Sequence, residues 1–234
     1  MRNLAKQRPW RTALWTGLLA ALLMPASGAF AQSQAYQQLS AQWWQWIISI
    51  PVDVNPLLDT SGANCMVGQR GSDWFLAGTE GGDVERTCSI PEGTSLFFPV
   101  INQVNFDTPN ACGQGPAPLP SSFYRALSKA FVDGATNLSV EVDGQALKHL
   151  QRVQSPIFEV AAPEDNLFVA GCLAFTGVTL PAGIYSPAVD DGYYVRLNPL
   201  AVGDHTLHIH AENPSAGFEV NVTYVLTVVP VVTH

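Results

Sequence analysis

The chain has 234 residues and a formal net charge of −8, because 19 Asp and Glu outnumber 11 Lys and Arg. A surface this acidic repels phosphate backbones and anionic membrane surfaces, which argues against a nucleic-acid or peripheral-membrane role. The hydrophobic content of 47% is typical of a globular protein with a sizeable core and is too high for a disordered chain.

The first 31 residues have the organisation of a signal peptide. An apolar stretch covers residues 12–25, and Ala29-Phe30-Ala31 is the small-x-small pattern that signal peptidases cut. The basic residues before the stretch are Arg2, Lys6, Arg8 and Arg11. Cleavage after Ala31 would remove four of the 11 basic residues and none of the 19 acidic ones, leaving a net charge of −12. We therefore expect an acidic, soluble protein, periplasmic or secreted, that carries no membrane span after cleavage.

Residues 34–50 are predicted to form a helix that is rich in tryptophan. Apolar residues recur there at steps of three and four, and Pro51 follows the last of them. The three tryptophans of Trp43-Trp44-Gln45-Trp46 would point in different directions on a helix. Core packing is therefore favoured over a flat platform for sugar stacking.

The middle of the chain alternates loops and short strands. Residues 51–72 and 105–120 are predicted loops, residues 78–83 a glycine-rich turn, and residues 122–133 a second helix that ends at Gly134. The strands predicted before this helix are 73–77, 86–90 and 94–101, the last of them almost wholly apolar and ended by Pro99.

Alternation of apolar and polar residues dominates the rest of the chain. Asp143-Gly144 predicts a type I′ turn between strands 138–142 and 146–150, and Asp191-Gly192 predicts a turn before strand 193–197. Further strands are predicted at 157–160, 167–170, 205–211 and 218–229. The pattern predicts one mostly β domain over residues 32–234: an antiparallel β-sandwich with the N-terminal tryptophan-rich helix and one internal helix.

All four cysteines lie after the predicted cleavage point. An even number in an exported chain indicates two disulfides with three possible pairings. We favour Cys65–Cys88 and Cys112–Cys172, because the loops that these bonds close do not cross. A zinc–thiolate site would usually contain a C-x-x-C pair, and the sequence has none.

Several segments resemble a group of exported bacterial proteins of uncharacterised function. They are WWQWIISIPVDVNP, DWFLAG, RTCSIPEG, LFFPVIN and PLAVGDHTLHIHA. The resemblance runs in order along most of the mature chain. It implies a shared fold and a shared compartment, and it transfers no catalytic residue.

One pattern in the chain suggests a metal centre. On a strand, His208, His210 and Glu212 would project from the same face, and two imidazoles with a carboxylate suit zinc, iron or manganese. The alternative is that they form the solvated face of an amphipathic strand, which explains the alternation without a metal. His205 would lie on the opposite face as a packed or turn-anchoring residue.

Calcium is the other cation that the sequence suggests. Calcium prefers oxygen ligands from loops, and four acidic residues are predicted in or beside turns, although the chain has no D-x-D-x-D-G loop. These residues are Asp83, Glu85, Asp190 and Asp191.

The standard nucleophile motifs are absent from the sequence, including G-x-S-x-G and H-E-x-x-H. The chain is therefore predicted to be a non-catalytic module that binds a ligand or an envelope partner through its loops. The aromatic residues predicted to anchor such a ligand are Trp74, Tyr193 and Tyr194. The alternative is a metal-dependent hydrolase or oxidoreductase that uses the face of His208, His210 and Glu212.

Overall fold

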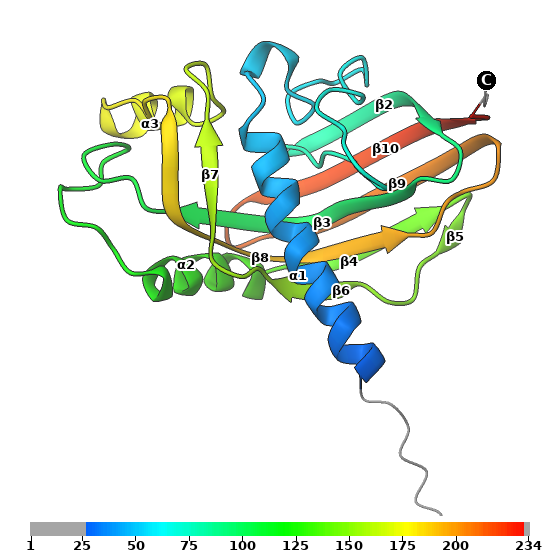
Figure 1. The fold of residues 1–234 in the computed structure, drawn as a ribbon, viewed down its shortest axis with the longest axis horizontal. Helices are drawn as coiled ribbons and strands as arrows, with labels where there is room; N and C mark the ends of the chain where they lie inside the picture. The colour runs from blue at the N-terminus through cyan, green and yellow to red at the C-terminus, as the bar shows by residue number, and fades with distance from the viewer. Residues whose placement is uncertain (1–26, 232–234) are drawn as a thin grey trace, which may run out of the picture.

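Two five-stranded β-sheets pack face to face, and a long N-terminal helix crosses the outer face of one of them (Figure 1). The computed structural model describes residues 27–231. The predicted signal peptide therefore lies outside the described residues, apart from residues 27–31, which belong to the first helix.

Ten strands and three α-helices make up the described chain. The helices are α1 (Ser27–Ile48), α2 (Ser121–Asp133) and α3 (Val169–Thr176), with a short 3-10 helix η1 (Val52–Val54) after α1. The strands are β1 (Asp73–Phe75), β2 (Gly82–Pro91), β3 (Ser95–Phe106), β4 (Thr136–Val142), β5 (Gln145–Ala146), β6 (Gln151–Gln154), β7 (Phe158–Ala162), β8 (Gly183–Leu197), β9 (Gly203–Asn213) and β10 (Phe218–Val229).

The predicted mostly β, sandwich-like fold is confirmed, although both sheets are mixed. Sheet A has the order β1-β3-β8-β6, with β7 also paired to β8, and sheet B has the order β2-β10-β9-β4-β5. Two pairings are parallel, β1 with β3 and β10 with β2, and the others are antiparallel. The β1–β3 pair is parallel because the chain crosses to sheet B as β2 and then returns to sheet A in the same direction.

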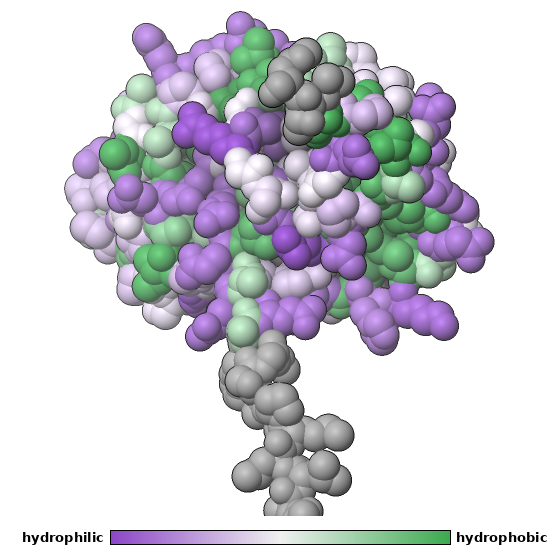
Figure 2. Space-filling view, turned by 45° about the vertical axis from the view of Figure 1, so that its right-hand side comes forward, coloured by the Kyte–Doolittle hydropathy of each residue, from purple (hydrophilic) through white to green (hydrophobic). Residues whose placement is uncertain are grey.

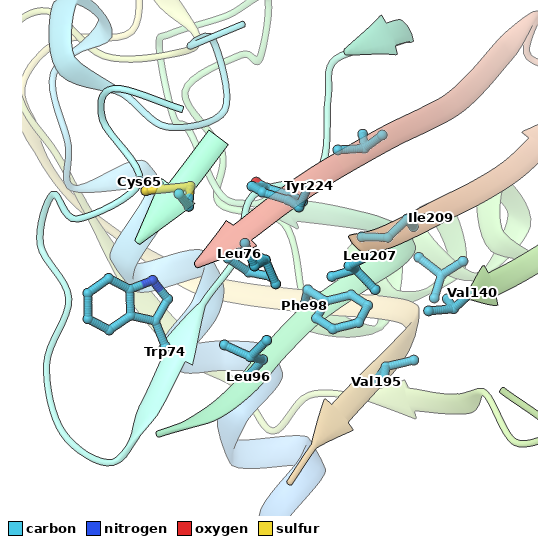
Figure 3. Packing of buried hydrophobic residues seen from close by; sticks show 14 of the residues in the cluster. Cys65, Trp74, Leu76, Leu96, Phe98, Val140, Val195, Leu207, Ile209 and Tyr224 are labelled. Atoms are coloured by element: carbon cyan, nitrogen blue, oxygen red, sulfur yellow. A yellow bond between two sulfur atoms is a disulfide. The ribbon is translucent and has the colours of Figure 1, made fainter. Parts of the chain in front are cut away.

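The space between the sheets forms the first hydrophobic core. Alternate residues of β9 and β10 point into it and meet the apolar residues of β1 and β3 (Figure 3). Leu76, Phe98 and Leu207 are among its fully buried members. Burial of this kind stabilises a sandwich by about 25 cal/mol per Å² of apolar surface.

Helix α1 forms the second core on the other face of sheet A. Trp43 and Ile47 are buried there together with Phe97 of β3. The helix ends at Ile48, close to the predicted stop, and the amide of Asn55 donates to the carbonyls of Ile47 and Ile50, each at 2.8 Å. These bonds satisfy carbonyls that the helix end would otherwise leave free.

Three local predictions from the sequence are wrong. The predicted strand 167–170 overlaps α3, which begins at Val169 and ends before Gly177 in the left-handed conformation. No turn occurs at Asp191-Gly192, because β8 runs without interruption from Gly183 to Leu197. Pro99 does not end β3, and the pairing with β8 continues past it with a shift in register. Strand β6 was not predicted.

The predicted disulfides and the predicted turn at Asp143-Gly144 agree with the structure. Cys65 is bonded to Cys88, and Cys112 to Cys172. Asp143 and Gly144 both have positive φ, 52° and 73°, as a type I′ turn requires. His205 anchors this turn, with Nδ1 at 2.7 Å from a carboxylate oxygen of Asp143.

Candidate functional site

Asp190 is the most unusual ionisable residue of the described chain. It lies in the middle of β8 on the face that meets α1, and it is 1% exposed. Its Oδ1 accepts hydrogen bonds from Trp44 Nε1 at 2.8 Å and from the Tyr194 hydroxyl at 2.9 Å. Its Oδ2 is buried and has no hydrogen-bond partner among the described residues. The carboxyl group is therefore only half satisfied.

Two elements fix the position of Asp190. Tyr194 lies on the same face of β8 because side chains alternate along a strand, and Ser40 and Trp44 lie one turn apart on α1. The backbone of Asp190 is held by Ser155, whose hydroxyl accepts from the Asp190 amide at 2.8 Å and whose amide donates to the Asp190 carbonyl at 3.1 Å.

Burial raises the pKa of Asp190 to about 7. Hydrogen bonds from Trp44 and Tyr194 oppose this rise, whereas the charge of neighbouring Asp191 adds to it. Desolvation dominates because the charged form of a fully buried carboxylate loses its hydration. Asp190 therefore titrates near neutral pH.

Asn102 connects this network to a surface pocket. Its Nδ2 donates to the Tyr194 hydroxyl at 2.9 Å, and the residue also lines the pocket. The close approach depends on Gly192, since a Cβ there would lie 2.5 Å from the Cβ of Asn102 and 2.8 Å from the Tyr194 ring.

The pocket has a volume of about 260 Å³ and runs beside β3. Strand β3 is paired with β1 only over residues 95–97, so from Pro99 onward its edge on this side has no neighbouring strand. The remaining walls come from α1, β10, the segments 78–80 and 167–168, and one residue of the loop after η1. The lining residues outside β3 are Trp43, Trp44, Leu57, Gly78, Thr79, Glu80, Leu167, Phe168, Phe218 and Val220.

The pocket is apolar with a few polar groups. Both tryptophans use their indole N–H groups elsewhere, Trp43 on the Leu76 carbonyl at 2.9 Å and Trp44 on Asp190. Their rings lie 4.9 Å apart at an interplanar angle of 89°. Glu80 is the single charged residue in the lining; its side chain is accessible to solvent, but neighbouring residues desolvate it in part and so raise its pKa.

Arg86 holds one wall of the pocket in place. It is 1% exposed, and its guanidinium donates to the carbonyls of Leu57 at 3.1 Å and Gly78 at 2.8 Å, both residues of the lining. It also donates to the Asp59 carbonyl and the Tyr224 hydroxyl. A buried cation needs such acceptors to replace its hydration, and here carbonyls and a hydroxyl supply them.

The predicted aromatic anchors do not line this pocket. Trp74 is 7% exposed and lies at the edge of the core between the sheets, as Figure 3 shows. Tyr194 is fully buried in the Asp190 network, and Tyr193 packs beneath the Arg152 guanidinium, 5.9 Å from the ring centroid. Two of the three are therefore core residues, because a neighbouring layer covers each face of sheet A.

The predicted metal ligands share one face of β9, as expected from their spacing. His208 Nε2 lies 2.7 Å from the Asn221 side-chain oxygen, and His210 Nε2 lies 3.2 Å from a Glu212 oxygen. Between residues 27 and 231, no group of three or more His, Cys, Asp or Glu side chains is placed to hold a metal ion.

The predicted calcium ligands lie on strands, and the expectation of a turn is wrong for the two in β8, whereas Asp83 follows the bend at residues 80–81. Asp83 and Glu85 lie on β2, and Asp190 and Asp191 lie within β8. Asp191 is paired with Arg152, whose Nε lies 3.0 Å from its Oδ1. The two adjacent aspartates point to opposite faces of sheet A and cannot share one ion.

Sequence reasoning missed the residues that build this site, including Asn102, Glu80 and Arg86. The one available signal was a polar residue, Asn102, directly after the apolar run of β3. No helix in the described part of the chain is both long and apolar enough to cross a membrane.

Comparisons with known protein families, curated proteins and solved structures find no match to this chain.

Proposed function

We propose that the chain is a non-catalytic binding protein, exported to the cell envelope or beyond it, that holds a small ligand in the pocket beside β3. The observation that carries the proposal is the pocket itself. Apolar and aromatic walls with a small number of polar groups are the usual composition of small-molecule sites.

The positions of the ionisable groups favour binding over catalysis. Asp190 has a pKa of about 7, which suits acid–base chemistry, but it is 1% exposed and does not line the pocket. A general acid or base must come within hydrogen-bond reach of its substrate. Asp190 is therefore better explained as part of the support behind the pocket, where it holds Trp44 and, through Tyr194, Asn102.

Two features support an oxidising compartment. Both cysteine pairs form disulfides, which persist in exported proteins and are rare in proteins of reducing compartments. The N-terminal sequence has the organisation of a signal peptide, and the resemblance to exported bacterial proteins implies the same destination. Together they support export.

Recovery of a bound compound from the native protein tests the proposal. We expect native mass spectrometry of protein purified from its own compartment to show an added small mass. Leu167→Trp places a larger side chain in the pocket lining, and this variant should lack the added mass. Leu173→Trp is the matched control, because Leu173 is exposed on α3 and does not line the pocket. Retention of the compound by Leu167→Trp would exclude this pocket as its site.

A further inference from the structure

We infer that the pocket beside β3 binds an organic ammonium ion, a small cation with apolar substituents. This inference rests on the proposed function and adds the chemical class of the ligand. It follows from two properties of the lining, its aromatic surfaces and the sign of its charge.

The aromatic surfaces suit a cation. Trp43, Trp44, Phe168 and Phe218 all line the pocket. Because the indole N–H groups of both tryptophans are bonded inside the protein, these residues offer ring carbon and no hydrogen-bond donor. The Trp43 and Trp44 rings meet edge to face, and Trp44 is the more exposed of the two, at 9% against 1%. Cations are attracted to the faces of such rings, and aromatic cages are a recurring site for quaternary ammonium groups.

The charge of the lining has a single sign. Glu80 is the one charged residue in it, so the pocket repels anions and attracts cations. Among the described ion pairs none involves Glu80, and desolvation is the cause of its raised pKa. A bound ammonium ion would supply the missing positive charge at the pocket. The acidic surface of the whole chain acts in the same direction.

The volume limits the size of the ligand. About 260 Å³ lies just below the range of roughly 300–1,000 Å³ that is typical of sites for drug-sized molecules. A trimethylammonium compound of a few carbon atoms is therefore a suitable probe, whereas a folded partner or a long peptide is not.

The decisive experiment compares a cation with its neutral isostere. The mature full-length chain is titrated with choline and with 3,3-dimethylbutan-1-ol, which replaces the charged nitrogen by carbon and keeps the shape. Binding is followed by tryptophan fluorescence and calorimetry at constant ionic strength. We expect choline to bind about tenfold more tightly than the alcohol, a ratio between those of exposed and of desolvated cation–π contacts.

Variants assign this preference to the pocket. Glu80→Gln should weaken choline binding several-fold and leave alcohol binding unchanged, and because Glu80 is exposed the variant should fold normally. Glu85→Gln, on β2 outside the pocket, is the matched control and should bind like the parent chain. Leu167→Trp should abolish binding of both compounds.

Each alternative result overturns the inference in a distinguishable way. Equal affinity for choline and the alcohol, lost in Leu167→Trp, would refute the ammonium class and leave the binding function standing. Choline binding that survives in Leu167→Trp would place it at another site. Absence of binding by both probes would refute the ammonium class, and the binding function would then depend on the mass-spectrometry result.

Discussion

Arg86 and Asp190 are both buried charged residues, but their surroundings satisfy them to different degrees. The guanidinium of Arg86 is surrounded by backbone carbonyls and the Tyr224 hydroxyl. The carboxyl of Asp190 has two donors on one oxygen and none on the other. The surroundings therefore satisfy Arg86 fully and Asp190 only in part, and burial raises the pKa of Asp190 to about 7.

Asp190 should make the protein less stable as pH rises. Its pKa in the folded state, about 7, lies above the value of 3.8 for an unperturbed Asp, so the folded state binds the extra proton between these values. The free energy of unfolding should then fall by up to about 4 kcal/mol from pH 4 to pH 7. Urea denaturation at a series of pH values measures this slope, and Asp190→Asn should flatten it.

His205 provides a control for that experiment. Its hydrogen bond to Asp143 raises its pKa, so it too stabilises the fold at low pH and loses that effect as pH rises through the folded-state value. His205→Gln should remove only a small part of the slope, because the pair lies near the surface. A slope that persists unchanged in Asp190→Asn would assign the effect to other groups.

Replacing Arg86 should destabilise the fold strongly. Arg86→Met leaves the carbonyls of Leu57, Asp59 and Gly78 without their donor, and we expect a loss of about 3–5 kcal/mol. Arg70→Met is the control, because Arg70 is exposed, and its effect should stay within about 0.5 kcal/mol. Equal melting temperatures for the two variants would contradict the role given to Arg86.

Among the strands, β8 is constrained by contacts on both of its edges and both of its faces. It is paired with β3, β6 and β7, and it carries Asp190 on one face and Asp191 on the other. Its path beside β3 requires glycine at position 192, where no Cβ fits against Asn102. The close contact between Gly192 and Asn102 is therefore needed for the hydrogen bonds that join Asn102, Tyr194 and Asp190.

Gly192→Ala should cost about 1–3 kcal/mol, because a Cβ at that position overlaps the Cβ of Asn102 and the Tyr194 ring. Gly183→Ala, in the same strand, is the matched control: its Cβ would lie 3.7 Å from the nearest atom, which is ordinary contact. Thermal unfolding of both variants tests the prediction. Similar melting temperatures would show that β8 shifts to accept the methyl group.

Helix α3 depends on its disulfide more than on packing. None of its residues is fully buried, and Phe175 is 91% exposed. The bond from Cys172 to Cys112 ties the helix to the loop after β3, and Leu167 and Phe168, just before the helix, line the pocket.

Removing this disulfide should loosen one wall of the pocket. For Cys112→Ala with Cys172→Ala we expect a loss of about 4 kcal/mol on the chain-entropy model and faster hydrogen exchange in residues 166–177. The double variant Cys65→Ala with Cys88→Ala is the control, with a loss of about 3.5 kcal/mol and unchanged exchange in that segment. Equal protection of α3 in both variants would contradict the prediction.

At the scale of the whole molecule, residues 27–231 form three layers, with sheet A in the middle. Sheet A is covered by α1 on one face and by sheet B on the other, which explains why β3 is almost continuously apolar while β9 and β10 alternate. Polar and apolar residues are intermixed on the face of the molecule that Figure 2 shows. The layered arrangement places the pocket where α1, β3 and β10 meet.

Local chemistry alone determined much of this fold. The spacing of apolar residues predicted α1, Gly134 marked the end of α2, and Asp143-Gly144 predicted the hairpin that His205 anchors. The cysteine order predicted both disulfides. Each of these features depends on residues close in sequence or on a small set of alternative pairings. The sequence therefore contains enough information to predict them.

Tertiary structure decided the site. Trp44 and Asp190 are 146 residues apart, and only the packing of α1 on sheet A brings them together. The dipeptide Asp-Gly shows most clearly that local sequence does not always predict local structure. It turns the chain at Asp143-Gly144, where both residues have positive φ, but it continues a strand at Asp191-Gly192. There Arg152 pairs with Asp191, and Asn102 leaves room only for a glycine, so contacts from other elements override the local preference for a turn.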